Sequence, residues 1–234
     1  MSKRSRLFVL LMSAALVPAC VFSTGYQKRG VTYVYATLDE GRGYVEHPIP
    51  NIDAGSFQAL DKHGYARDDL QVYYHEYAVE GADPGSFTAI SESYGRDNAS
   101  VYYQVRVIPG ADPFTFALFD IQWGRDARDV YRQDVPLEAC DPATFTFLKD
   151  GWNRDDQCVY REAKKLPDGD PDSFVVLNSW FAKDQNNVYS SITGVIAGAD
   201  PATFELMEGM CEVCAEDANS CYRYEERVDC ESLR

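Results

Sequence analysis

The sequence contains few of the residue arrangements that carry out catalysis. Its 234 residues include only three histidines, His47, His63 and His75, all in the N-terminal third. No serine lies in a nucleophile elbow, no glycine-rich loop is placed to bind phosphate, and no histidine pair has zinc-binding spacing. Since catalysis needs such groups in one place, we expect no enzymatic activity and no cofactor. The enzymatic alternative is a hydrolase that uses acidic pairs such as Asp155 and Asp156.

Basic residues are scarce relative to acidic ones. The sequence has 22 lysines and arginines against 37 aspartates and glutamates, which gives a formal net charge of −15 at pH 7. Such a chain repels phosphate backbones, so we exclude nucleic acid as a partner. We interpret the negative charge as a solvated surface that keeps the protein soluble, with recognition of basic partners as the alternative.

The apolar run at the start of the chain is too short to span a bilayer. It extends from Leu7 to Val17 and follows three basic residues, Lys3, Arg4 and Arg6, which is typical of an export signal. We therefore predict a signal peptide over residues 1–19. Without it, 19 basic residues remain against 37 acidic ones, so the mature chain is still more acidic.

The end of this signal, Leu16-Val-Pro-Ala-Cys20, resembles a bacterial lipobox. This pattern predicts cleavage before Cys20 and attachment of lipid to that cysteine, which would anchor the protein to a membrane. Ordinary signal cleavage is the alternative, because Val17 and Ala19 also suit it. Val21 follows the cysteine in place of an aspartate that would favour inner-membrane retention. We expect an exported envelope protein in the outer membrane or periplasm.

Two aromatic markers recur along the chain at a nearly constant interval. Tyrosines of Val-Tyr pairs lie 29 residues apart at Tyr73, Tyr102, Tyr131, Tyr160 and Tyr189. Phenylalanines recur every 29 or 30 residues at Phe57, Phe87, Phe116, Phe145, Phe174 and Phe204. A fixed period of about 20 to 50 residues indicates an array whose units bury apolar surface against their neighbours.

The block Phe181-Ala-Lys-Asp-Gln-Asn-Asn-Val-Tyr189 resembles the DKNYY family of bacterial repeat proteins. Other copies read Tyr65-Ala-Arg-Asp68, Tyr94-Gly-Arg-Asp97, Trp123-Gly-Arg-Asp126, Trp152-Asn-Arg-Asp155 and Cys214-Ala-Glu-Asp217. Arginine replaces the family's lysine in four copies, and the resemblance extends from about Tyr65 to Tyr222. It implies a repeat fold and a lipoprotein-like envelope location, and it carries no activity or site residues.

Each unit is expected to contain a β-hairpin and a short helical turn. In Gly198-Ala-Asp-Pro-Ala-Thr-Phe204, Asp200 suits a helix N-cap and Pro201 the first helical position. Another apolar residue follows each phenylalanine by three positions, which predicts one face of a helix of one or two turns. These residues are Leu60, Ile90, Phe119, Leu148, Leu177 and Met207.

The fold class that follows is mainly β. We expect units of about 29 residues over 51–210, with hairpins that pair side by side into a continuing sheet. An open array is the first choice, and a closed propeller-like ring is the alternative. Residues 20–50 form a divergent lead-in, in which Val31-Thr-Tyr-Val-Tyr35 predicts a strand and the segment from Gly41 to Pro50 a loop.

One aspartate recurs in each unit, at Asp68, Asp97, Asp126, Asp155, Asp184 and Asp217. We interpret these residues as turn formers, because an aspartate side chain accepts hydrogen bonds from backbone amides two residues further on. A row of carboxylates that binds calcium or a repetitive cation is the alternative. The best local calcium candidate is Asp168-Gly-Asp-Pro-Asp172, but Asp170 is already explained as a helix cap. We predict no metal site.

The cysteines beyond Cys20 are even in number, which predicts disulfides in an exported chain. They are Cys140, Cys158, Cys211, Cys214, Cys221 and Cys230. Cys140 and Cys158 share the fourth unit and are predicted to pair. Two further disulfides should stabilise a C-terminal cap over 211–234, preferably Cys211 with Cys221 and Cys214 with Cys230. The alternative is a four-cysteine zinc site, although no second closely spaced pair follows Cys211-x-x-Cys214.

These features together predict a non-catalytic repeat protein of the cell envelope. It would serve as a structural module or bind another envelope protein or polymer through a repeated face. The alternatives are an envelope hydrolase that uses acidic residues and a calcium-binding module. A binding module is expected to expose a row of equivalent aromatic side chains, and an enzyme to have one nonrepeating pocket with convergent acids.

The predicted anchor can be tested by the mass of the mature protein. Protein extracted from membranes is expected to begin at Cys20 and to carry the added mass of acyl chains. Cys20→Ser is expected to move the protein to the soluble fraction, because the chain then lacks lipid. Intact-mass spectrometry of both fractions measures these outcomes. A soluble mature form that begins at an unmodified Cys20 would rule out the anchor.

Overall fold

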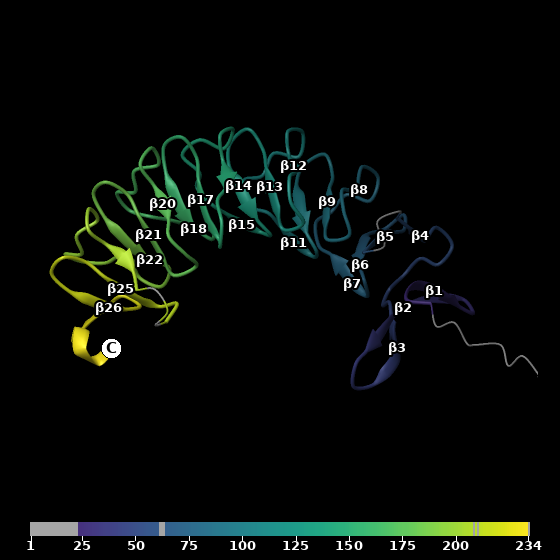
Figure 1. Ribbon diagram of the computed structural model, residues 1–234. Helices are drawn as coiled ribbons and strands as arrows, with labels where there is room; N and C mark the ends of the chain where they lie inside the picture. Colours follow the sequence, from purple (N-terminus) through teal and green to yellow (C-terminus); the bar gives the residue numbers. More distant parts are fainter. Residues whose placement is uncertain (1–22, 61–63, 208, 210, 234) are drawn as a thin grey trace, which may run out of the picture.

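The computed structural model describes residues 23–60, 64–207, 209 and 211–233. The predicted signal peptide, Cys20 and His63 lie outside these residues. The fold is nearly all β, with one 3₁₀ helix and no α-helix in the described part of the chain. No helix in that part is long and apolar enough to cross a membrane. The short sheets follow one another in an open arch, with the lead-in at one end and the C-terminus at the other (Figure 1).

A three-stranded antiparallel sheet precedes the repeats. It contains β1 (Gly25–Arg29), β2 (Thr32–Asp39) and β3 (Gly43–Pro48). The predicted strand around Tyr33 is therefore confirmed as part of β2. The predicted loop from Gly41 to Pro50 is wrong, because most of it forms β3, which pairs with β2 from Asp39↔Gly43 to Val34↔Pro48. Glycine and proline counts suggested a loop, but the antiparallel pairing satisfies the backbone of this segment.

Six units follow, each a four-stranded antiparallel meander. Unit 1 contains β4 (Gln58–Ala59), β5 (Tyr65–Arg67), β6 (Val72–Tyr74) and β7 (Tyr77–Val79). Unit 2 contains β8 (Thr88–Ala89), β9 (Tyr94–Arg96), β10 (Val101–Tyr103) and β11 (Arg106–Val107). Unit 3 contains β12 (Ala117–Leu118), β13 (Trp123–Arg125), β14 (Val130–Arg132) and β15 (Val135–Pro136).

The last three units have the same strand order. Unit 4 contains β16 (Thr146–Phe147), β17 (Trp152–Arg154), β18 (Val159–Arg161) and β19 (Lys164–Lys165). Unit 5 contains β20 (Val175–Val176), β21 (Phe181–Lys183), β22 (Val188–Ser190) and β23 (Gly194–Val195). Unit 6 contains β24 (Glu205–Leu206), β25 (Cys214–Glu216), β26 (Cys221–Arg223) and β27 (Glu226–Val228), and η1 (Cys230–Leu233) follows it.

The sheets of successive units stack on one another and do not join. In unit 2, Tyr102 packs with Tyr65 of unit 1, whereas Val101 packs with Tyr131 of unit 3. This division follows from strand geometry, because neighbouring side chains point to opposite faces of a sheet. The predicted continuing sheet is therefore wrong, while the open array of β units is confirmed.

A turn links one unit to the next, and the turns before Phe87, Phe116 and Phe204 contain a hydrogen bond between residues i and i+4. In the link between units 1 and 2, the amide of Phe87 donates to the carbonyl of Asp83 at 3.0 Å, and the chain then enters β8. The predicted short helical turn is therefore reduced to a single hydrogen-bonded turn, and it does not extend past the phenylalanine. Ile90, expected on the same helical face, instead follows β8 and packs at the edge of the core.

The two ends of the array are covered by different devices. Tyr26, Tyr33 and Phe57 pack around Tyr73 at the N-terminal end. At the other end, Leu233 of η1 packs against cysteines of unit 6. Each end unit thus gains a cover that a stacked neighbour would otherwise provide.

All six described cysteines lie in disulfides. Cys140 pairs with Cys158, as the sequence predicts. In the cap, Cys211 pairs with Cys214 and Cys221 with Cys230, so the preferred cap pairing was wrong. The reason is that η1 returns the chain toward Cys221 on β26, while Cys211 lies immediately before β25 and Cys214 begins that strand.

Gly95 tests the stacking of the sheets. A Cβ atom at this position would lie 2.2 Å from Cζ of Phe87, so Gly95→Ala is expected to lower the free energy of unfolding by about 1–3 kcal/mol. Gly41→Ala is the control, because its Cβ would meet only the Asp39 carboxylate at 3.5 Å. Urea unfolding compares both variants with the wild type. Equal stability of the Gly95 variant would contradict the described packing of Phe87.

Candidate functional site

The repeated aspartates form the densest polar network in the units. In unit 2, Asp97 Oδ1 accepts hydrogen bonds from the amides of Ala99 and Ser100, both at 2.8 Å. Its Oδ2 accepts from the amide of Asp83 at 2.9 Å and from the Tyr102 hydroxyl at 2.8 Å. One carboxylate therefore closes its own turn, holds the returning strand and fixes the preceding link.

Every unit repeats this network. The hydroxyls of Tyr73, Tyr102, Tyr131, Tyr160, Tyr189 and Tyr222 donate to Asp68, Asp97, Asp126, Asp155, Asp184 and Asp217, respectively. Burial alone would raise the pKa of these carboxyls, but the hydrogen bonds outweigh it and hold their pKa below the ordinary value. The interpretation of the aspartates as turn residues is confirmed by these contacts.

Two of the carboxylates considered for metal binding or hydrolysis, those of Asp170 and Asp155, accept hydrogen bonds within the fold. Asp170 accepts from the amide of Asp172 at 3.1 Å and from the Ser173 hydroxyl at 2.6 Å, which is its predicted role as a cap. Asp155 is buried in the turn network, while Asp156 is exposed. Across the described residues, no group of three or more histidines, cysteines or acids is placed to hold a metal ion.

The basic residue before each of the first five aspartates joins neighbouring units, a role that the sequence did not reveal. Arg96 Nη1 donates to the carbonyl of Pro113 in the next link at 2.8 Å. Lys183 Nζ donates to the carbonyls of Pro201 and Phe204, both at 2.9 Å. In the sequence, this basic residue recurs 17 or 18 positions before the proline of the following link. That nearly constant spacing could have indicated the contact.

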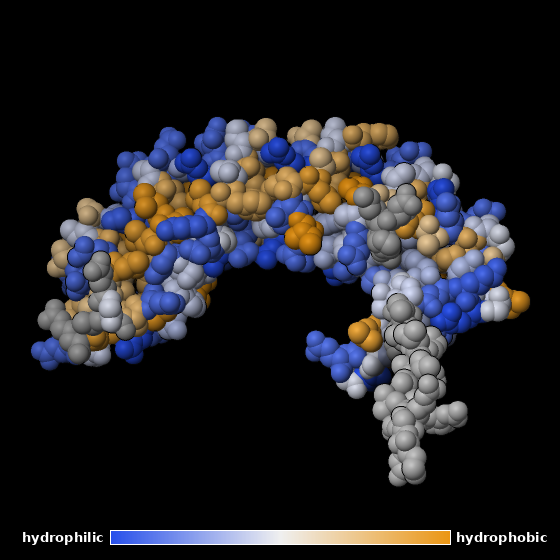
Figure 2. Space-filling model, turned by 45° about the vertical axis from the view of Figure 1, so that its right-hand side comes forward, coloured by the Kyte–Doolittle hydropathy of each residue, from blue (hydrophilic) through white to orange (hydrophobic). Residues whose placement is uncertain are grey.

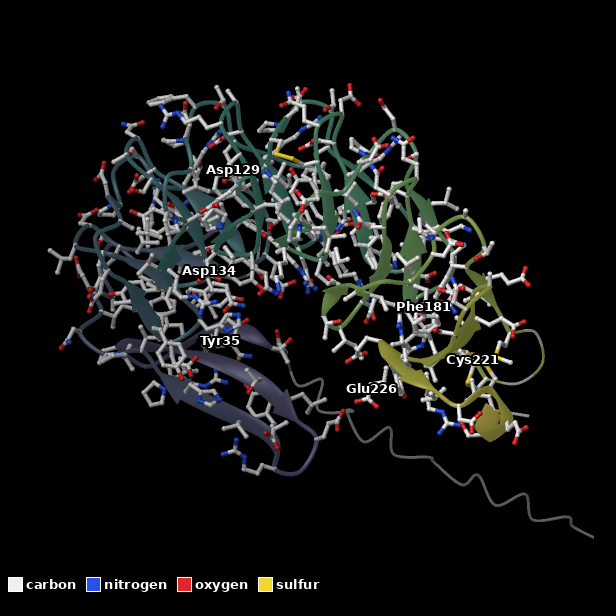
Figure 3. The ribbon with its side chains drawn as sticks, turned by 90° about the vertical axis from the view of Figure 1, so that its left-hand side faces the viewer. Tyr35, Asp129, Asp134, Phe181, Cys221 and Glu226 are labelled. Carbon is white, nitrogen blue, oxygen red and sulfur yellow. A yellow bond between two sulfur atoms is a disulfide. The ribbon has the colours of Figure 1, made fainter. Side chains whose placement is uncertain are left out.

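The predicted row of exposed aromatic side chains is absent from the described units, because the repeat tyrosines and tryptophans are buried. Tyr102 is 1% exposed and Trp152 is 0% exposed. Tyr94 also uses its hydroxyl between units, donating to the carbonyl of Gln122 at 2.8 Å. The aromatic residues thus form the core, and Phe181 in Figure 3 lies within unit 5 among them.

Apolar side chains remain at the surface in or directly after the first strands of units 3 to 5. Phe119 is 38% exposed, Phe147 41% and Val175 52%. The ring centroids of Phe119 and Phe147 are 5.4 Å apart, so units 3 and 4 share one surface cluster. Figure 2 shows apolar surface in a band that follows the arch over several units. We call the row formed by Phe119, Phe147 and Val175 the first-strand row.

The described histidines belong to the junction between the lead-in and unit 1. The ring of His75 is stacked between Tyr35 at 4.0 Å and Tyr74 at 4.1 Å. Burial lowers the pKa of His75, which favours its neutral form. His47 Nδ1 lies 3.5 Å from a Glu76 carboxylate oxygen. These contacts place both histidines in a packing junction.

Polar grooves lie between successive units beside the aspartate turns. One of about 300 Å³ separates units 1 and 2 and is lined by Arg67 and Asp68 among others. Another of about 240 Å³ separates units 2 and 3 and is lined by Arg96 and Asp97 at equivalent positions. Asp68 and Asp97 already accept hydrogen bonds within their turns. The grooves therefore repeat with the units and differ from the single acidic pocket expected of a hydrolase.

The model of one protein family, the DKNYY family, matches residues 65–227. This match spans the six units from β5 to β27. No curated protein and no solved structure matches the chain.

Asp97→Asn tests the turn network. The side-chain NH₂ group of the asparagine would face N–H or O–H groups that now donate to Asp97. The free energy of unfolding is therefore expected to fall by about 1.5–3 kcal/mol at pH 7. The folded-state pKa of Asp97 is below its unfolded value, so its contribution is present above about pH 4 and is lost as the pH falls through the folded pKa. The difference between variant and wild type should therefore shrink in acid.

Asp69→Asn is the control, because Asp69 follows the equivalent Asp68 of unit 1 and its side chain is exposed. Urea unfolding from pH 7 to pH 3 measures all three proteins. The network would lose its assigned role if both substitutions had equal, small effects at pH 7.

Proposed function

We propose that this chain, which belongs to the DKNYY family, is a non-catalytic repeat module that binds an envelope protein or polymer through the first-strand row. The observation that carries this proposal is the exposure of Phe119, Phe147 and Val175 on an array whose other aromatic residues are mostly buried. Apolar surface that a monomer leaves open over neighbouring elements is typical of an interaction site.

Neighbouring side chains pack against the two phenylalanines of the first-strand row. Trp123 lies 5.3 Å from Phe147, and the Arg125 guanidinium lies 5.6 Å from the centroid of Phe119. Such contacts restrict the rings before a partner arrives, which reduces the entropy lost on binding. Aromatic residues and arginine are also the residue types that most often dominate binding energy.

A non-catalytic role is supported by the use of the repeated acids. Asp155, half of the acidic pair considered for hydrolysis, receives the Tyr160 hydroxyl and the amides of Asp141, Gln157 and Cys158. A carboxylate with four donors is poorly suited to exchange protons with a substrate.

An envelope location is supported by two features. Three disulfides suit an oxidising compartment. The first twenty residues have the pattern of an export signal that ends at Cys20. We therefore propose lipid attachment at Cys20, which would leave the array free to contact partners beside the membrane.

A photo-crosslinking phenylalanine analogue at position 119 tests the binding surface in the exporting cell. We expect one reproducible crosslinked partner, because the ring would lie in the interface. The same analogue at Leu70, 72% exposed on the turn of unit 1, is the control and should give less of that product. Mass spectrometry of the crosslinked species identifies the partner.

Phe119→Ser and Phe147→Ser together should reduce capture of that partner at least about fivefold, as expected for loss of central apolar contacts. Leu70→Ser should not reduce it. Equal crosslinking from positions 70 and 119 would count against the first-strand row. Unchanged capture by the double variant would do so as well.

A further inference from the structure

A groove of about 460 Å³ lies between units 4 and 5, beside their fourth strands. Arg161, Lys164 and Lys165 contribute to it from unit 4, and Ser191 and Thr193 from unit 5. This volume falls within the range of about 300–1,000 Å³ that is usual for small-molecule sites. We call this space the 4–5 groove.

The groove lies where the repeat changes length. In unit 4, Arg161 pairs with Lys164, which leaves two residues in the turn between β18 and β19. In unit 5, Ser190 pairs with Gly194, which leaves three residues between β22 and β23. The extra residue enlarges the turn Ser191-Ile192-Thr193 that forms one wall. The 4–5 groove is thus a local departure from the periodic surface.

Lys164 lacks the acidic partner that the equivalent position in unit 2 has. In unit 2, Arg106 begins the fourth strand, and its Nε lies 2.9 Å from the carboxylate of Asp134 in the next unit, labelled in Figure 3. Lys164 begins the fourth strand of unit 4, but the facing turn of unit 5 carries no acid. Among the described residues, no acidic side chain lies within ion-pair distance of Lys164.

The single acid of the groove is already neutralised. Glu162 Oε2 lies 2.6 Å from Arg132 Nη1, and its Oε1 lies 3.1 Å from Arg161 Nη1. Lys165 Nζ lies 2.8 Å from Cys140 Sγ at the interface of units 3 and 4, so Lys164 is the cation that faces unit 5. The groove is therefore locally positive on a chain with a net charge of −15.

The groove also offers hydroxyl donors and apolar surface. Ser191 and Thr193 can donate hydrogen bonds, and Leu166 and Val195 supply apolar contacts. A long polyanion would meet repulsion from the rest of this acidic protein, whereas a compact anion would meet mainly the local cations. We propose that the 4–5 groove binds a small organic anion, with its carboxylate or phosphate group at Lys164 and its hydroxylated body against the turn of unit 5.

The proposal can be tested with three sugars that differ in charge. Glucuronate presents a carboxylate, glucose 6-phosphate presents a phosphate, and glucose is the neutral control. Isothermal titration of the purified mature protein is expected to show saturable binding of at least one charged sugar and none of glucose. Binding should weaken as sodium chloride is added, because salt screens the ion pairs. The stronger of the two anions identifies the preferred group.

Lys164→Gln is expected to weaken that binding about fivefold through loss of one partly exposed ion pair. Arg128→Gln is the matched control, because it removes one positive charge from a side chain that is 70% exposed and outside the groove. Both variants should unfold at the wild-type temperature. Three results would overturn the proposal: equal binding of glucose, no binding of either anion at millimolar concentration, or equal losses in the two variants.

Discussion

The structure depends on a carboxylate that accepts four hydrogen bonds and is repeated once in each unit. Asp97 joins three separate parts of the chain, since its donors are two amides of its own turn, the hydroxyl of Tyr102 and the amide of Asp83 in the preceding link. Burial and this carboxylate raise the pKa of Tyr102 to about 12, so the hydroxyl remains a donor in neutral solution. Strands of two or three residues are too short to fix their own register, and this network supplies the missing constraint.

The sequence contained enough information to predict the repeat period, the β class and the aspartate turns. Tyr102 and Phe87 recur at a constant interval because each occupies the same place between stacked sheets. The stacking itself could not be predicted, because a hairpin pattern does not distinguish edge pairing from face packing. The fourth strands could not be predicted either. A two-residue strand such as Arg106–Val107 is too short to show an alternation of apolar and polar residues. The cap disulfides depended on the path of η1, which spacing does not determine.

The residues that define the repeat are largely used to build it. The aspartates close turns, the tyrosines fill the core, and Arg96 and its equivalents lock each unit to the next. Specificity must then come from positions that vary between units. Both proposed surfaces have this property: Phe147 occupies a place held by Ala89 in unit 2, and Lys164–Lys165 occupies a place held by Val135–Pro136 in unit 3. The recurring residues therefore mark the scaffold, and the varying residues mark the surfaces that can bind a partner.

The separation of the sheets has a mechanical consequence. No strand is shared between units, so successive units are held by side-chain contacts and by a single covalent link each. A force that pulls the ends of the arch apart would act on each of these contacts between units, and they would break one at a time. Arrays whose units contact only their neighbours respond in this sequential way. Extension under tension would then release length in steps of about one unit, while the aspartate network inside each remaining unit stays closed.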